Sequence, residues 1–241
     1  MPVIKPNTST TIGADTYSAW RAASLGAITE AIERRLVLDL MGDVTGAQLL
    51  EIGCGDGGLL CQAVMRGAEA TRSIPIQRCY RLRGCVRQRQ EIRATFLSGR
   101  LERLPLANAS FHVVTSVTVR CFVSDALGAL REMARVLRPG GRLEIGELGR
   151  WSAWAAIRSM RGWLGSATWR AARFRAASEL RSLRETAGLS VTAIRGAVFY
   201  PPVAFLARAL APIDLRLGNL TTVGAAFIAL LAASANQARI A

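Results

Sequence analysis

The sequence predicts an α/β fold, with a doubly wound, mostly parallel sheet, an antiparallel last strand and a helical cap. Strand-like and helix-like segments alternate along residues 49–147, as they do when helices connect parallel strands. The apolar run 49–52 leads into a glycine-rich loop and then a helix-like segment. Two further strand-like segments near the end of the chain complete the predicted sheet.

Each element follows from its own local pattern. Residues 15–41 carry Trp20, Ile28 and Ile32 at helical spacing, which predicts a helix within an N-terminal helical segment, 1–42. A later helix should end before Pro139, where two glycines follow. Residues 148–188 contain four tryptophans among many arginines and predict a helical cap within a single domain, 1–241. The remaining expected elements are strands at 49–52, 93–97, 111–119, 142–147, 191–199 and 224–232, and helices at 59–66, 126–137 and 177–187.

Composition indicates a globular protein with a full core. The chain has 241 residues, of which 51% are hydrophobic, and a formal net charge of +14. Lys5 is the only lysine, and such an arginine bias is typical of a GC-rich genome. The N-terminus shows no signal-peptide pattern, and the longest apolar run, 223–235, is shorter than the roughly 20 residues of a membrane span. We therefore expect a cytoplasmic protein.

The cysteines indicate neither a metal site nor a disulfide framework. There are five, an odd number, and none forms a C-x-x-C pair. Free cysteine behaves as a small apolar residue, so buried thiols are expected.

The loop after residues 49–52 is the main candidate binding site. Its glycines, Gly53, Gly55 and Gly57, allow a sharp turn and a close approach of the backbone to a ligand. The Glu51 carboxylate precedes them and could hold a ribose or an amino group. By itself the pattern also fits a dinucleotide-binding loop, or a tight strand-to-helix turn that binds nothing.

Three blocks together are more specific than the loop alone. They read LLEIGCGDGGLL (49–60), LERLPLANASFHVVTSV (101–117) and LREMARVLRPGGRLEIGEL (130–148). In this order and spacing they resemble a class I S-adenosylmethionine-dependent methyltransferase of the small-molecule type (type 11-like), over about residues 17–233. The resemblance implies a Rossmann-like fold, S-adenosyl-L-methionine as cofactor, a small-molecule acceptor and no metal.

The resemblance also implies where the cofactor binds. The glycine loop would pass beside its methionine part, Leu101 would meet the adenine ring, and Tyr17 and Trp20 would fold over it. Ser116 and Val117 end a strand, where ligands of open α/β sheets bind. No catalytic base stands out, and His112 is expected to be structural. The complete set of expected cofactor-binding residues is Glu51, Gly53, Cys54, Gly55, Gly57, Leu101, Glu102, Ser116, Val117, Tyr17 and Trp20.

One segment departs from the family pattern. The family ends its second strand with an acid that binds the ribose hydroxyls, whereas residues 71–90 hold six arginines and no acid, so the usual strand is expected to be missing. Arg100 also stands where the family has Asp, and Glu102 could partly compensate. Leaving ribose hydroxyls poorly satisfied costs roughly 1–3 kcal/mol. One hypothesis, which the gene sequence would test, is that 71–90 is translated from a shifted reading frame.

Three functions remain open from the sequence. The first is methyl transfer to a small molecule, an in-line displacement that gains mainly from proximity and orientation. The second is a methyltransferase-fold protein that is catalytically impaired because of residues 71–90. The third is association with a membrane surface or a nucleic acid through the arginine- and tryptophan-rich cap. The sequence does not indicate an oligomeric state.

Overall fold

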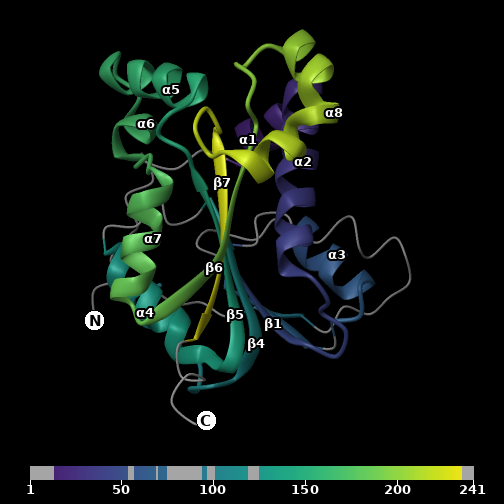
Figure 1. Cartoon of the computed structure of the whole chain (residues 1–241), viewed down its shortest axis with the longest axis vertical. Coiled ribbons are helices and arrows are strands. Elements are labelled where there is room, and N and C mark those ends of the chain that lie inside the picture. The colour runs from purple at the N-terminus through teal and green to yellow at the C-terminus, as the bar shows by residue number, and fades with distance from the viewer. Residues whose placement is uncertain are drawn as a thin grey trace.

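A seven-stranded sheet forms the centre of the computed structural model, which describes residues 14–53, 57–68, 70–74, 94–96, 101–118 and 125–234. The strand order is β3-β2-β1-β4-β5-β7-β6 (Figure 1). β1 to β5 are parallel, and β7 is antiparallel between β5 and β6, which confirms the predicted fold class. The strands are β1 (Gln48–Ile52), β2 (Ala70–Ile74), β3 (Ala94–Phe96), β4 (Phe111–Val117), β5 (Leu137–Leu148), β6 (Leu189–Ala197) and β7 (Phe227–Ser234).

Helices cover both faces of the sheet. α4 and α7 lie on one face, and α2, α3 and α8 lie on the other (Figure 1). α8 lies between the last two strands in the chain. The helices are α1 (Ala14–Ala22), α2 (Ser24–Met41), α3 (Gly58–Met65), α4 (Ala126–Val136), α5 (Ala153–Trp163), α6 (Ala167–Ala171), α7 (Ala177–Thr186) and α8 (Ala204–Leu220).

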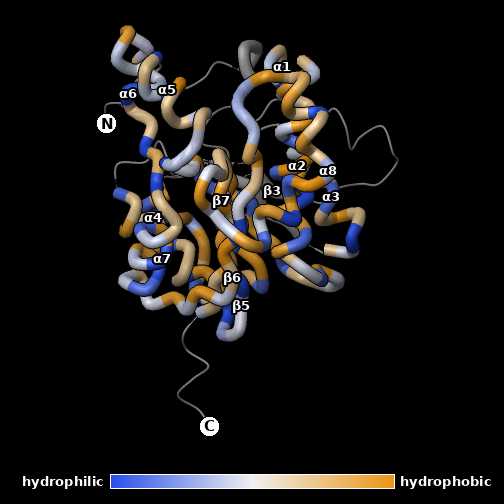
Figure 2. The backbone as a smooth tube through the Cα atoms, turned by 45° about the horizontal axis from the view of Figure 1, so that its top comes forward, coloured by the Kyte–Doolittle hydropathy of each residue, from blue (hydrophilic) through white to orange (hydrophobic). Residues whose placement is uncertain are grey.

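Two hydrophobic cores follow from the alternation of side chains along the strands. Leu50 and Val114 face α4 and α7 and join the first core. Leu49 and Val113, one residue earlier on each strand, face α2 and α8 and join the second core. In Figure 2, hydrophobic stretches gather around β6 and β7 at the centre of the molecule. Both layers are needed, because a parallel sheet buries both of its faces.

The expectation that the second strand is missing was wrong. β2 pairs in parallel with β1, in a register that runs from Gln48 opposite Ala70 to Ile52 opposite Ile74. Strand pairing uses backbone N–H and C=O groups, so this short segment can form a strand without the family's sequence pattern. The rest of the arginine-rich segment, 75–90, lies outside the described residues, as does Arg100.

The N-terminal segment contains two helices where the spacing predicted one. Ala23 has an extended backbone (φ −72°, ψ 146°) and separates α1 from α2. A Cβ at Gly26 would lie 2.0 Å from the Trp20 carbonyl oxygen, so glycine at this position allows the end of α1 to lie against α2. Apolar residues keep a helical spacing on both sides of Ala23, so the spacing alone did not predict the break.

The boundary between α4 and β5 is where Pro139 and its glycines predicted it. α4 ends at Val136, and Gly140 has a positive φ of 73°. β5 starts earlier than predicted, because Leu137 already pairs with Phe111, and the register shifts before Val113 pairs with Arg142. The residues between form an irregularity in the strand.

The predicted cap, 148–188, divides into two parts. α5 and α6 pack on each other beyond the end of the sheet (Figure 1). α7 instead packs against α4 and β6, and Leu180 lies in the first core. The cap is therefore formed by α5 and α6, and α7 belongs to the layer that covers the sheet. None of the helices in the described ranges is long and apolar enough to cross a membrane.

Candidate active site

The glycine loop connects β1 to α3 at the carboxyl edge of the sheet. Gly53 has a φ of 79° and Gly57 a φ of 77°, a left-handed conformation that favours glycine. Gly57 is the N-cap of α3, so the strand turns into the helix at this residue. Cys54 and Gly55, which were also expected to bind the cofactor, lie outside the described residues.

Glu51 begins a buried polar row on the α2 face of the sheet. The strand register places it beside Thr115, and Thr115 beside Glu144. The three residues are 5%, 0% and 0% exposed. Within the described part of the chain, the Thr115 hydroxyl and both Glu144 carboxylate oxygens have no hydrogen-bond partner. Burial raises the pKa of Glu144 well above its ordinary value, and the charge of Arg142 opposes this only in part.

The end of β4 lies beside the end of β1. Ser116 is in register with Ile52, and its buried hydroxyl has no hydrogen-bond partner among the residues described. Leu101 packs in the same hydrophobic core as Ile52. Val117 packs against the second core, on the opposite face of the sheet. Glu102 is half-buried.

The residue that follows β4 is strained. Thr118 has a φ of 53°, which is unusual for a β-branched residue. Its backbone N–H donates to the Gly146 carbonyl oxygen at 2.8 Å, which ties this turn to β5. Backbone strain of this kind is concentrated at functional sites, and here it lies where the sheet was expected to meet its ligand.

The N-terminal candidates remain predictions. Trp20 lies near the end of α1 and packs against the second core. Tyr17 lies in α1, but its side chain is not among those described.

Tyr200 connects the cap, α2 and the turn before α8, a contact that the sequence did not suggest. Its hydroxyl lies 3.1 Å from the Thr29 hydroxyl, and its carbonyl oxygen accepts a 2.8 Å hydrogen bond from Trp154 Nε1. Burial raises the pKa of Tyr200 to about 12. The nearby Asp214 carboxylate accepts the backbone N–H groups of Val198 and Phe199, each at 2.8 Å. These bonds fix the turn beside the cap.

Glu33 is a second feature that sequence reasoning missed. Burial raises its pKa to about 7, and the negative charges of Glu30 and Asp214 act in the same direction. The charge of Arg158 on α5 opposes this shift. Glu33 on its helix looks like an ordinary surface acid, and no local pattern marks it. Its raised pKa comes mainly from burial, with a contribution from Asp214 on α8, and both arise only in the folded chain.

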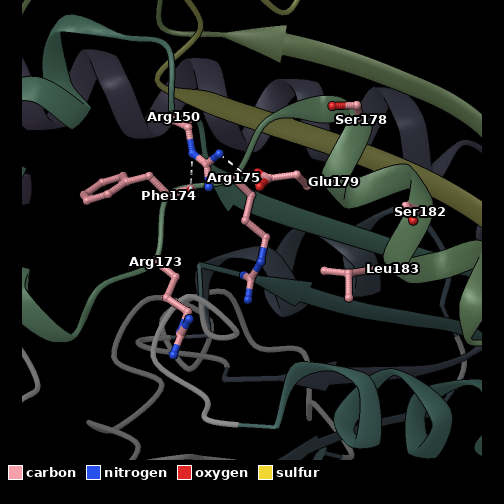
Figure 3. A pocket seen from close by; sticks show the side chains of 8 residues that line it. All are labelled: Arg150, Arg173, Phe174, Arg175, Ser178, Glu179, Ser182 and Leu183. Atoms are coloured by element: carbon pink, nitrogen blue, oxygen red, sulfur yellow. Dashed lines mark hydrogen bonds and ion pairs between the residues drawn. The ribbon is translucent and has the colours of Figure 1, made fainter.

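A hollow of about 690 Å³ opens between the end of β5 and α7 (Figure 3). Arg150 bridges it, since one guanidinium nitrogen lies 2.9 Å from a Glu179 oxygen and another donates to the Phe174 carbonyl oxygen at 3.2 Å. A second hollow, of about 700 Å³, shares Arg150 and Phe174 and reaches Trp151 and Phe199. The two hollows adjoin the cap at the carboxyl end of β5.

A buried ion pair supports the wall of the first hollow. Arg175 donates to Glu147 at 2.8 Å, and an Arg184 nitrogen lies 3.7 Å from the other Glu147 oxygen. Glu147 and Arg184 are both 0% exposed. The two arginines come from α7 and the segment before it, so the pair fastens both to β5.

His112, which was expected to be structural, is held on both sides. Its Nδ1 accepts the Gln48 backbone N–H at 2.9 Å, and its Nε2 lies 2.7 Å from an Arg138 nitrogen.

Across the residues that the structure describes, no group of acids, histidines and cysteines could hold a metal ion. The expectation of free thiols was wrong for Cys61, which is disulfide-bonded, because an odd cysteine count does not exclude a single bridge.

Comparison with known proteins identifies the family. The family described as "Methyltransferase domain" matches residues 50–145. A ubiquinone biosynthesis O-methyltransferase of Idiomarina loihiensis is 30% identical over 173 residues, which are 67% of this chain and 69% of that protein. The chain belongs to the class I S-adenosylmethionine-dependent methyltransferases. The cofactor of this family is S-adenosylmethionine.

One solved structure agrees in fold, and a further relative is similar in sequence. A solved S-adenosylmethionine-dependent methyltransferase of Thermotoga maritima, a possible histamine N-methyltransferase, has a TM-score of 0.66 at 22% identity and covers 91% of this chain and 94% of its own. An uncharacterized protein of Mycobacterium tuberculosis is 37% identical over 101 residues, or 42% of this chain. The chain spans about a third (35%) of that relative's length.

Proposed function

We propose that this methyltransferase transfers the methyl group of S-adenosylmethionine to a small-molecule acceptor bound beneath the cap. The observation that carries the proposal is the carboxyl edge of β1 and β4. Two left-handed glycines, Gly53 and Gly57, turn the backbone there, beside buried Glu51 and the Ser116 hydroxyl. A buried hydroxyl that lacks a partner within the described residues fits a ligand's polar atom.

The residues present fit the cofactor at this edge. Gly53 and Gly57 would let the backbone approach its methionine part, and Glu51 offers an acceptor for an amino or hydroxyl group. When bound, the cofactor supplies a methyl group on a positively charged sulfur. The protein's own contribution is to orient the acceptor in line with that group and to exclude water, which can provide most of the rate enhancement.

The acceptor site is proposed in the hollow of about 700 Å³ beside the cap. Trp151 and Phe199 give it aromatic walls, and Arg150 gives it one cationic side. This lining suits a flat apolar molecule with a polar or anionic substituent. Similar proteins include a demethylmenaquinone methyltransferase of Beutenbergia cavernae, 32% identical over 131 residues, so aromatic acceptors are the first to test.

Calorimetric titration with S-adenosylmethionine and with its demethylated product tests the proposal. We expect binding of both, and weaker binding to Gly57→Val. Gly188→Val is a matched control, because Gly188 also has a positive φ, of 78°, but follows α7, far from the loop in the chain. Absence of heat at millimolar ligand would contradict the proposal and favour the catalytically impaired alternative.

A further inference from the structure

The outer end of the α5–α6 pair carries large apolar side chains in solvent. Met160, Trp163 and Leu164 are 50%, 86% and 80% exposed. Arg161 directly follows Met160 in the sequence, and Arg170 lies across the hairpin that α5 and α6 form. Both arginine side chains are also exposed. We call these five residues the cap tip. An exposed apolar cluster of this kind usually marks an interaction site.

The packing of the cap does not require these side chains. Trp154 and Trp169 instead stack on Arg158, with each ring centroid 4.8 Å from the guanidinium carbon, and Trp154 packs into the second core. Gly162 fixes the hairpin, since a Cβ there would lie only 3.0 Å from the Arg170 backbone nitrogen. Trp163 and Leu164 thus project from a hairpin that other residues already hold together.

Charge indicates what kind of partner the cap tip would take. The two cap helices and the turn between them, residues 153–171, contain three arginines (Arg158, Arg161 and Arg170) and no aspartate or glutamate. A second copy of the same surface would bring like charges together, which is unfavourable. An anionic partner with an apolar interior satisfies both the arginines and the apolar side chains.

The position of the cap tip suits contact with a flat surface. α5 and α6 extend beyond the sheet at one end of the molecule (Figure 1), and hydrophobic colour reaches the outer end of the pair (Figure 2). Trp163 is the last residue of α5 and Leu164 its C-cap, next to Gly165, whose φ is 110° and which has open space around it. No part of the described chain covers this turn closely enough to bury it.

We propose that the cap tip docks on the surface of an anionic lipid bilayer. Trp163 and Leu164 enter the boundary between headgroups and acyl chains, where tryptophan is favoured. Arg161 and Arg170 contact lipid phosphates, which attract basic side chains near the surface. This surface contact is separate from methyl transfer and does not depend on it.

Co-sedimentation of the full chain with vesicles tests the proposal. Vesicles of phosphatidylcholine with phosphatidylglycerol are compared with vesicles of phosphatidylcholine alone. We expect binding to the anionic vesicles that weakens at high salt, and at least a tenfold lower partition coefficient for the double variant W163S/L164S. The matched control is Met65→Ser, because Met65 is 61% exposed but ends α3, which leads away from the carboxyl edge of the sheet.

A charge variant separates the two contributions. R161E/R170E should also lower the partition coefficient at least tenfold, whereas Arg35→Glu, on the exposed side of α2, should have little effect. Circular dichroism melting of each variant checks that the fold is kept. Failure of the wild type to bind anionic vesicles, or equal binding by W163S/L164S, would overturn the proposal. Tighter binding to a random duplex DNA than to vesicles at the same salt would assign the surface to nucleic acid and overturn it too.

Discussion

Replacing Glu144 by glutamine should change how the stability of the protein depends on pH. Glu144 lies in the middle of β5, is 0% exposed, and has a carboxylate without hydrogen-bond partners in the described chain. Burial raises its pKa, so the folded protein holds a proton on this side chain at a pH where the unfolded chain has released it. The free energy of unfolding must therefore fall as pH rises above the ordinary pKa of glutamate.

The size of the effect follows from the proton balance. Between the unfolded and folded pKa values, one such group lowers the free energy of unfolding by about 1.4 kcal/mol for each pH unit. Typical domains unfold with only about 5–15 kcal/mol, so the slope is large enough to measure. Glutamine keeps the shape of the side chain and removes the titration, so the variant should lack this slope.

Urea denaturation at pH 5, 6 and 7 measures the difference. The difference in unfolding free energy between Glu144→Gln and wild type should grow with pH, by at most about 1.4 kcal/mol for each pH unit, in favour of the variant at the higher pH. Glu185→Gln, at an exposed position near the end of α7, is the control and should follow the wild type. Parallel curves for wild type and Glu144→Gln would refute the reasoning.

Three further substitutions test individual contacts. Glu147→Gln removes the charge that faces buried Arg175, so it should lower the free energy of unfolding by about 3 kcal/mol; an unchanged urea midpoint would contradict this. Gly218→Ala would set a Cβ 1.9 Å from the Gly196 carbonyl oxygen and force α8 from β6, which should cost about 1–3 kcal/mol in thermal unfolding. Gly57→Ala should cost about 1–2 kcal/mol through its left-handed backbone and should weaken cofactor binding in calorimetry.

Local signals in the sequence were sufficient for most of the sheet. The apolar run before Gly53 became β1, and the proline and glycines after α4 mark the irregular start of β5. Each of these signals acts within a few residues. The break between α1 and α2 at Ala23 was not predicted, because the spacing of apolar residues does not reveal the close contact between Gly26 and the Trp20 carbonyl group.

The parts of the site that depend on distant contacts could not be predicted. The hydroxyls of Thr29 and Tyr200 meet across 171 positions of the chain. Glu33 acquires its raised pKa mainly from burial, to which the charge of Asp214 on α8 adds. The absence of an acid after residue 70 was wrongly taken as the absence of a strand, although β2 needs only its backbone to pair with β1.

The position of β7 has a consequence for synthesis on the ribosome. Among the strands described, β6 pairs with β7 alone, and β7 also covers one edge of the twelve-residue strand β5. Until β7 emerges, β6 has no place in the sheet, and β5 exposes a row of unpaired backbone groups. Such an edge can pair with other chains. A chain whose translation stops before residue 227 should therefore aggregate rather than persist as a smaller folded protein.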